Sequence, residues 1–511
     1  MNQIVGEQLE DLLRLALSND DHAVNQAVNR YGNNAHLCFN TVDWAKLRAE
    51  TEDGDLKFCR VNWGRNFVDF AGCDFGDGDL TLTGSFNGGV SFAGAVFGEG
   101  DVSFAGSTFA NADFSGSMFC GTGQVSFAGV TFLGKTQLNF KRLDHKEVYF
   151  GQLSLNHGRQ LKDCQISGSS FSLVTGEFSG EKIDLCRARF EASLVMLNFS
   201  DASGLDTVDL SKTSWACETA LIHGLKLKKG ALNFTSAFLR DTEYFSIEDV
   251  STEVGNLFFA QTVFPTNGIC RFGFKDLGIG QVNFDYAQFA GSVEIEQGED
   301  AVWSSVFSFR GATFEGPLRL DGLRFGPVPD LTGTEFRKHL SMSGLRFDVG
   351  NKKGLVDKGQ RASKLQRLKE LAEGNRDHNL ALVCHAHEMR ANRWQKNGAS
   401  PWASYLLDLI YDLTSNYGQS IFRPCLLLFV SWILFGWYYG TLAVEDGATM
   451  VFSATTAVPF LTASGIFRSE EFKALFDNPS SDLYLMMGAQ GLISFALLFL
   501  VGLGLRNRFR I

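Results

Sequence analysis

The stretch "VSFAGAVFGEGDVSFAGSTF", residues 90–109, contains the same short motif twice. Its phenylalanines, Phe92 with Phe97 and Phe104 with Phe109, form pairs five residues apart. A helix repeats its buried face every 3.6 residues and a strand every two, so no continuous element of either kind keeps such a pair on one face. Every Phe points inward only if the backbone turns a corner within each five-residue unit. The pattern therefore predicts short strands joined at bends into a solenoid.

The repeat extends far beyond this stretch. "VSFAG" occurs at 90–94, 102–106 and 125–129, and the paired phenylalanines continue to Phe314. Composition agrees, with 47 Phe and 54 Gly but only 8 Pro among 511 residues. Two residues before each Phe the side chain is usually small or branched, as at Ala112 and Val125, where the next inward side chain of a strand falls. An antiparallel sandwich with many turns is the alternative, and the odd spacing disfavours it.

The unit "ADF" at 112–114 resembles the repeat of the pentapeptide-repeat family, A(D/N)LXX. That resemblance implies a right-handed, four-sided (quadrilateral) β-helix, which we place at 38–348. The corners "GEGD" and "GTGQ" are longer than the family pattern, and the repeat is ragged between about 140 and 235. Residues 1–37 are expected to form an N-terminal capping region, because Leu9, Leu12, Leu13 and Leu17 give an amphipathic helix.

The sequence predicts no enzyme. A solenoid filled with Phe has no interior cavity for a substrate, and no motif supplies a catalytic nucleophile with its base, a phosphate loop or a pair of acids. The ten cysteines include no CxxC pair, so we interpret them as buried fillers and expect no metal and no cofactor.

Charge on the solenoid is acidic. Residues 66–134 contain seven acidic side chains and no Lys or Arg. Pentapeptide-repeat proteins that imitate DNA present such a surface, but an acidic surface that keeps the rod soluble is the favoured interpretation. We expect no direct nucleic-acid binding, and we expect substitution of Asp101, at a corner, to have almost no effect.

A basic segment follows the solenoid. Residues 349–400 are expected to form a helical hairpin around "EGNRD", and 401–420 an interfacial helix. Cys384, His387 and Glu388 have a spacing that would let them meet a metal on one helix, but a hairpin core with incidental histidines is favoured.

Two uncharged runs, 424–444 and 483–505, are each long enough to cross a bilayer. The distribution of Lys and Arg predicts an inner (cytoplasmic) membrane protein of two spans with both termini cytoplasmic, and membrane lipids as partners. The expected membrane-surface anchors are Trp402, Arg423, Arg506, Arg508 and Arg510.

A third uncharged run, 447–467, lies between the two and is interrupted at Pro459 and Gly465. A third crossing would separate the basic ends, so a re-entrant segment is predicted. The motifs "SNYGQSIFRP", "VPF" and "LGLRNRFRI" resemble the C-terminal part of bacterial membrane-bound pentapeptide-repeat proteins, whose last domain resembles a two-helix potassium-channel pore. No TVGYG-like filter is present, so potassium selectivity does not follow. The candidate pore-lining residues are Ser453, Thr455, Thr456, Pro459, Thr462 and Ser464.

The favoured function is therefore an ion-permeable channel. Domain 421–511 would form a homo-oligomer, a tetramer by the resemblance, and the solenoid would act as a sensor or as a docking module for a protein partner. The alternatives are a non-conducting membrane-tethered scaffold, including a nucleic-acid mimic, and a stress or phage-defence effector of the membrane.

Overall fold

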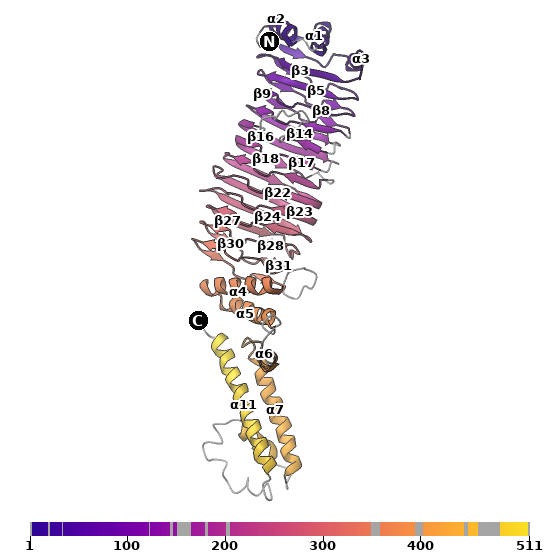
Figure 1. The fold of residues 1–511 in the computed structure, drawn as a ribbon. Helices are drawn as coiled ribbons and strands as arrows, with labels where there is room; N and C mark the ends of the chain where they lie inside the picture. The colour runs from indigo at the N-terminus through magenta and orange to yellow at the C-terminus, as the bar shows by residue number, and fades with distance from the viewer. Residues whose placement is uncertain are drawn as a thin grey trace. The chain divides into compact units, whose positions relative to one another are not determined.

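The computed structural model describes residues 3–18, 21–32, 34–121, 123–143, 147–150, 165–178, 182–200, 205–348, 358–393, 402–443, 448–457 and 481–508. The chain divides into two compact units, Met1–Gly354 and Leu355–Ile511. Figure 1 shows strands stacked turn upon turn in the first unit and helices in the second.

The first unit is a parallel β solenoid, as predicted. Each strand pairs in parallel with the strand one turn later, so that Val68 lies opposite Val90 and Val90 opposite Ala112. Farther along, Ala220 lies opposite Phe245 and Phe245 opposite Cys270. The register step is 22 residues in the first case (90 − 68) and 25 in the second (245 − 220), and it returns to 22 in the last coils (340 − 318).

The stretch quoted above forms one four-sided coil. Its four short strands begin at residues 90, 96, 102 and 108, and each pairs with a separate strand of the next coil. The strands of two or three residues are β1 (Gln3–Ile4), β2 (His36–Cys38), β4 (Phe67–Asp69), β6 (Val90–Ser91), β7 (Val96–Phe97), β8 (Val102–Ser103), β9 (Thr108–Phe109), β10 (Ala112–Asp113), β11 (Met118–Phe119), β12 (Gln124–Ser126), β13 (Thr131–Phe132), β15 (Glu147–Tyr149), β17 (Lys182–Asp184), β19 (Thr207–Asp209), β20 (Ser214–Trp215), β25 (Gln281–Asn283), β26 (Gln288–Phe289), β28 (Val306–Ser308), β29 (Thr313–Phe314), β30 (Leu318–Arg319), β31 (Arg324–Phe325), β32 (Glu335–Phe336), β33 (Leu340–Ser341) and β34 (Arg346–Phe347). The longer strands are β3 (Leu56–Asn62), β5 (Leu80–Phe86), β14 (Thr136–Leu143), β16 (Gln165–Phe178), β18 (Arg189–Asn198), β21 (Thr219–His223), β22 (Lys226–Asn233), β23 (Tyr244–Phe258), β24 (Ile269–Leu277) and β27 (Ser292–Gln297).

The solenoid core is a set of stacked phenylalanine columns. Phe97 stacks on Phe119 with ring centroids 4.2 Å apart, and Phe104 stacks on Phe127 at 5.0 Å. Every one of these rings is at most 1% exposed. The inward Phe predicted from the period of five is confirmed, because successive Phe occupy successive sides of the coil and meet their counterparts on the next turn.

The "FAG" corner is a tight turn with a left-handed residue, which favours glycine. The carbonyl of Phe92 accepts a hydrogen bond from Ala95 N at 3.0 Å, and Gly94 between them has φ 66°. Positive φ at the third position is the signature of a type II turn. Farther along, the equivalent position is held by residues with side chains, such as Lys212 at φ 57° and Gln261 at φ 57°.

The polar residue before each core Phe has a structural role. Asp113 Oδ1 accepts a hydrogen bond from Ser115 N at 2.9 Å, and Asp69 Oδ1 accepts one from Ala71 N at 3.0 Å. Such side-chain turns favour Asp, Asn and Ser. The Asp of "ADF" is therefore explained by the corner that follows it.

Acidic side chains also bridge successive coils. Asp101 N donates to Asp79 Oδ1 at 2.8 Å, and Asp101 Oδ1 accepts from Gln124 N at 2.8 Å. From the sequence, substitution of Asp101 is expected to have almost no effect, but the hydrogen bond that its carboxylate accepts from a backbone N–H of the next coil favours a small cost.

Asp101→Ala is expected to lower the free energy of unfolding by about 0.5–1 kcal/mol, because the exposed Gln124 N must exchange this acceptor for water. Asp101→Asn keeps an acceptor oxygen and is expected to cost less than half of that. Thermal unfolding of the full chain provides the measurement, with Glu99→Ala at an exposed neighbouring position as the control. Equal melting temperatures for Asp101→Ala and Glu99→Ala would contradict this role.

Helices cover the start of the solenoid. Helix α1 (Glu7–Leu17) and helix α2 (Asp21–Arg30) both contact β3, and α3 (Trp44–Ala49) follows β2. Leu9, Leu12 and Leu13 of α1 are at most 3% exposed, whereas Leu17 is only partly buried. The apolar face expected at the N-terminus therefore packs on the first coils.

The second unit is helical throughout its described part. Its helices are α4 (Lys358–Gly374), α5 (His378–Asn392), α6 (Trp402–Ser415), α7 (Phe422–Leu442), α8 (Thr449–Ala457) and α11 (Ser481–Arg508). Helices α4 and α5 pack together as the predicted hairpin, with Leu365, Leu368 and Cys384 fully buried. Among the described residues, Cys384, His387 and Glu388 do not bring their ligand atoms together. Glu388 instead pairs with Lys369 at 3.0 Å.

Candidate functional site

Two helices of the second unit are long and apolar enough to cross a membrane. Helix α7 has 21 residues and α11 has 28. At about 1.5 Å per residue both exceed the roughly 30 Å of a bilayer core. Within the chain only 11% and 17% of their most apolar segments are buried. Most of their apolar surface therefore remains available for contact with lipid or with another chain.

The two helices form an antiparallel pair, seen in Figure 1 side by side. Near the start of α7, the Gly418 carbonyl accepts a hydrogen bond from Asn507 Nδ2, near the end of α11, at 3.3 Å. Near the other end of the pair, Tyr439 packs with Leu483. The start of α7 and the end of α11 therefore lie together.

This arrangement gathers several of the predicted membrane-surface anchors. Arg423 near the start of α7 and Arg506 and Arg508 near the end of α11 are all exposed, at the same end of the pair. Trp402 is the first residue of α6, and Arg510 lies outside the described residues. Anchoring to a membrane surface stays a prediction for all five.

Helix α8 is short and is fixed between the two long helices. Its nine residues span about 14 Å, too little to cross a bilayer. Ser453 of α8 is fully buried and donates its hydroxyl to the Trp432 carbonyl at 2.8 Å. Gln490 of α11 donates to Ser453 Oγ at 2.8 Å and to its carbonyl at 3.0 Å. Tyr439 Oη donates to Gln490 Oε1 at 2.8 Å.

A glycine allows α8 to approach α7 closely. A Cβ atom at Gly436 would lie 2.5 Å from Met450 Sδ and 3.5 Å from Ser453 Cβ. A side chain at this position would require the Met450 side chain to move, and it would lie in contact with Ser453. The absence of a side chain at Gly436 therefore leaves room for Met450 and Ser453 of α8 against α7.

Of the other candidate pore residues, the structure describes two and leaves three outside the described part of the chain. The Thr455 and Thr456 hydroxyls donate to the Phe452 carbonyl at 2.7 and 3.0 Å, and the residues are 5% and 7% exposed. Pro459, Thr462 and Ser464 lie outside the described residues. The described candidates therefore hydrogen-bond within their own chain, and pore lining stays a prediction.

The sequence patterns did not predict a role for three polar residues of the long helices. These are Tyr439, Gln490 and Ser494, all fully buried. Within the described residues Ser494 Oγ has no hydrogen-bond partner. Gln490 is the only Asn or Gln in the run 483–505. Because a polar amide inside an apolar helix is costly, this position carried a usable signal.

An ion-pair network joins the hairpin to α6. Arg390 of α5 binds Asp412 of α6 at 2.6 Å, and Arg393 binds Asp408 at 2.6 Å and Asp412 at 2.8 Å. The Arg393 and Asp412 side chains are only 12% and 15% exposed. Hydrogen bonds from Arg390, opposed by burial and aided by Arg393, hold the pKa of Asp412 below its usual value.

The turn after α6 completes this network. Tyr417 is 2% exposed, accepts a hydrogen bond from Arg393 and donates to Asp408 at 3.0 Å. Burial raises the pKa of Tyr417 to about 12. Asn416, Tyr417 and Gly418 have φ values of 52°, 53° and 78°, three left-handed residues in succession. The motif "SNYGQS" therefore forms the sharp turn that connects α6 to α7.

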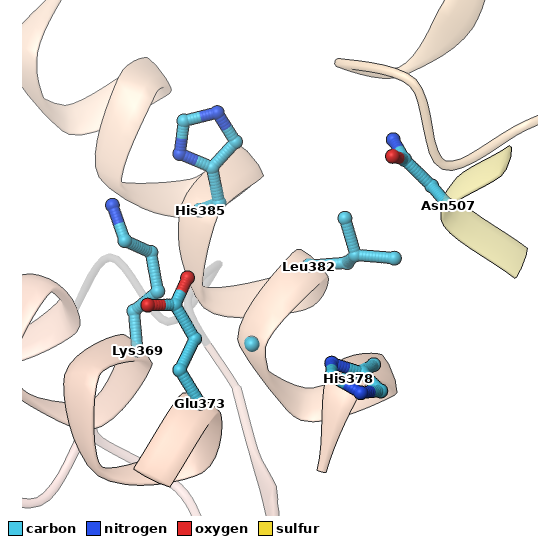
Figure 2. A pocket seen from close by; sticks show the side chains of 7 residues that line it. Lys369, Glu373, His378, Leu382, His385 and Asn507 are labelled. Carbon is cyan, nitrogen blue, oxygen red and sulfur yellow. The ribbon is translucent and has the colours of Figure 1, made fainter. Parts of the chain in front are cut away.

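A pocket of about 440 Å³ lies beside this turn, between α4, α5 and the end of α11. Figure 2 shows Lys369, Glu373 and His385 on one side and Asn507 on the other, with Leu382 between them. His385 Nδ1 is buried without a hydrogen-bond partner among the described residues, and its nearest acid is Glu388 at 3.8 Å. Lys369 and Glu373 thus place groups of opposite charge in the pocket.

The second unit thus contains a buried polar cluster at α8, defined by Tyr439, Ser453 and Gln490, and an ion-pair junction at α6. The geometry alone supports these assignments, and the family resemblance seen in the sequence stays a prediction. Comparison of the chain with protein-family models, with characterised proteins and with solved structures found no significant match.

Proposed function

We propose that this chain is a membrane protein of the pentapeptide-repeat type whose helices α7, α8 and α11 assemble with other copies into an ion-permeable pore. In this proposal α7 and α11 span the inner membrane with both termini cytoplasmic, and four copies surround the pore by the resemblance. The solenoid acts as a sensor or docking module, and the hairpin transmits its state to the pore.

The observation that carries the proposal is the buried polar cluster at α8. A short helix that ends at the depth of a bilayer must have its polar groups satisfied by protein or by water. Gln490 donates hydrogen bonds to the hydroxyl and the carbonyl of Ser453, and the Tyr439 hydroxyl donates to Gln490. A long helix, a short polar helix and a second long helix follow in the order of a two-helix channel.

Other copies are required to enclose a pore. The three helices described in this part of the chain, two long and one short, do not surround an axis, so several subunits would have to do so. Large apolar side chains are available on the long helices for this contact and for lipid: Trp437 is 69% exposed, Leu485 71% and Leu492 73%.

Gln490→Leu is expected to reduce ion flux at least ten-fold, because α8 loses its hydrogen bonds to α11 and is no longer fixed against it. The assay is ion flux into liposomes containing the purified full-length protein. Leu492→Ile, an exposed change of equal volume on the same helix, is the control. Gln490→Leu should stay in the membrane fraction because α7 and α11 keep their apolar surfaces.

A wild-type protein that conducts in no lipid or voltage condition, or that is a monomer in mild detergent, would overturn the channel proposal. The non-conducting scaffold is then the better account. It is favoured by one observation: the hydroxyls of Ser453, Thr455 and Thr456 all bond within their own chain. Nucleic-acid mimicry has less support, because Asp79 and Asp101 use their carboxylates on backbone N–H groups of the solenoid.

A further inference from the structure

We infer that the first coil of the solenoid binds a divalent transition-metal ion, Zn²⁺ being the best match, through His36, Cys38 and Asp69. The inference is independent of the proposed channel. The His36 ring nitrogen, the Cys38 sulfur and an Asp69 carboxylate oxygen all lie within 4.8 Å of one another. The strand register explains this, because Cys38 of β2 lies opposite Asp69 of β4 in a parallel pair.

The three ligand atoms, all within 4.8 Å of one another, can reach the separations of a tetrahedral site by small movements. Bond lengths of about 2.0–2.3 Å from zinc to nitrogen, oxygen and sulfur imply ligands about 3.3–3.6 Å apart. His36 Nε2 and Asp69 Oδ2 are 3.0 Å apart, as a hydrogen-bonded pair. A small outward movement therefore allows the metal to replace the proton that these two atoms share.

The surroundings orient the ligands. Asp69 Oδ1 accepts a hydrogen bond from Ala71 N at 3.0 Å, which leaves Oδ2 for the metal. Such outer hydrogen bonds fix ligating groups and are a regular feature of metal sites. Gln3 Nε2 donates to Cys38 Sγ at 3.2 Å, which holds the sulfur on the side of Asp69. Rotation of that amide would offer Gln3 Oε1 as a fourth ligand.

The donor set selects the class of metal. One thiolate, one imidazole and one carboxylate favour zinc and related borderline ions over magnesium or calcium, which prefer oxygen alone. Cys38 is 2% exposed, so its sulfur is shielded from solvent. Binding releases the thiol proton, and the imidazole must be neutral.

A second cluster of possible metal ligands lies in the same solenoid and differs from the first in the groups around it. Asp184, Cys186 and Asp209 also lie within 4.8 Å of one another. There, however, Lys182 Nζ is 3.1 Å from Asp184 Oδ2, and Asn233 Nδ2 is 3.2 Å from Asp209 Oδ1. Burial raises the pKa of the Cys186 thiol. This second cluster has a resident cation, Lys182, and no histidine, and it serves as an internal control.

A metal ion at these three residues would connect separate parts of the solenoid. His36 and Cys38 lie on one coil and Asp69 on the next, and Gln3 belongs to β1, which pairs with β2. The ion would therefore join two coils and the N-terminal strand. Because the ends of solenoids need closing, metal binding is expected to stabilise this end of the molecule.

The test uses the full-length protein in detergent, stripped with chelator and titrated with Co²⁺ and then Zn²⁺. All variants carry Cys425→Ser to remove an exposed thiol. We expect one Co²⁺ per chain, with a thiolate-to-cobalt charge-transfer band that Zn²⁺ abolishes. Cys38→Ser should remove the band, His36→Gln should weaken binding at least ten-fold, and Cys186→Ser should change neither.

Asp69→Asn keeps the acceptor for Ala71 N and is chosen so that folding is preserved. Zn²⁺ should raise the melting temperature of the protein that retains Asp69 and leave that of Asp69→Asn unchanged. A wild type without the band, a band that survives Cys38→Ser, or a band lost in Cys186→Ser would overturn the inference. The three side chains would then be an ion pair beside a buried thiol.

Discussion

Replacing Phe104 with aspartate is expected to unfold the solenoid or to reduce its free energy of unfolding by several kcal/mol. Phe104 is fully buried, stacks on Phe127 at 5.0 Å and meets Phe92 and Phe114 edge to face at 5.4 and 5.5 Å. The substitution removes these ring contacts and places a carboxylate where aromatic rings surround it. Burying an unpaired charge costs more than most domains can tolerate.

Circular dichroism and thermal unfolding of the full chain measure this effect. Phe104→Leu is the matched control, because it keeps an apolar side chain and is expected to cost about 1–2 kcal/mol. An unchanged melting temperature for Phe104→Asp would mean that the ring does not point into the solenoid.

Replacing Arg393 with methionine is expected to loosen the junction between the hairpin and α6, at a cost of about 2–4 kcal/mol. Arg393 binds Asp408 and Asp412 and also Tyr417, and no other described cation pairs with Asp408. Removing one partner of a buried ion pair leaves the other charge without compensation. Arg393→Lys supplies one point charge in place of the planar fork and should recover only part of the loss.

Hydrogen exchange in α6 and the melting temperature of the second unit measure this effect. Arg337→Met is the control, because Arg337 and Glu315 form a pair with 67% and 46% exposed side chains, and exposed pairs contribute less than about 1 kcal/mol. Equal exchange in α6 for Arg393→Met and the wild type would show that the junction does not depend on this network.

The junction should also weaken in acid. Because the folded-state pKa of Asp412 is lowered, its contribution is present above the unfolded value of about 3.9 and is lost as the pH falls below it. Faster exchange in α6 is therefore expected at pH values under about 4, and Arg393→Met should show less of this dependence.

The sequence by itself determined the solenoid and the two apolar helices. The repeat consists of local requirements. Phe recurs five residues apart, Asp113 and Ser103 each precede a Phe, and Gly94 occupies a corner. Each follows from backbone geometry over a few residues, which repeats unchanged from one coil to the next. The uncharged runs likewise follow from length and composition, because a bilayer sets the number of apolar residues needed to cross it.

Only the tertiary structure decided which polar side chains meet. Cys38 and Asp69 are 31 residues apart (69 − 38) and lie together through the register of β2 and β4. Gln490 of α11 donates a hydrogen bond to Ser453 of α8, and the Asp101 carboxylate accepts one from the Gln124 N–H of the next coil. Such contacts depend on how elements pack and on the register between strands. Spacing along the chain does not encode these quantities, because the coils differ in length and the helices are joined by segments of unequal size.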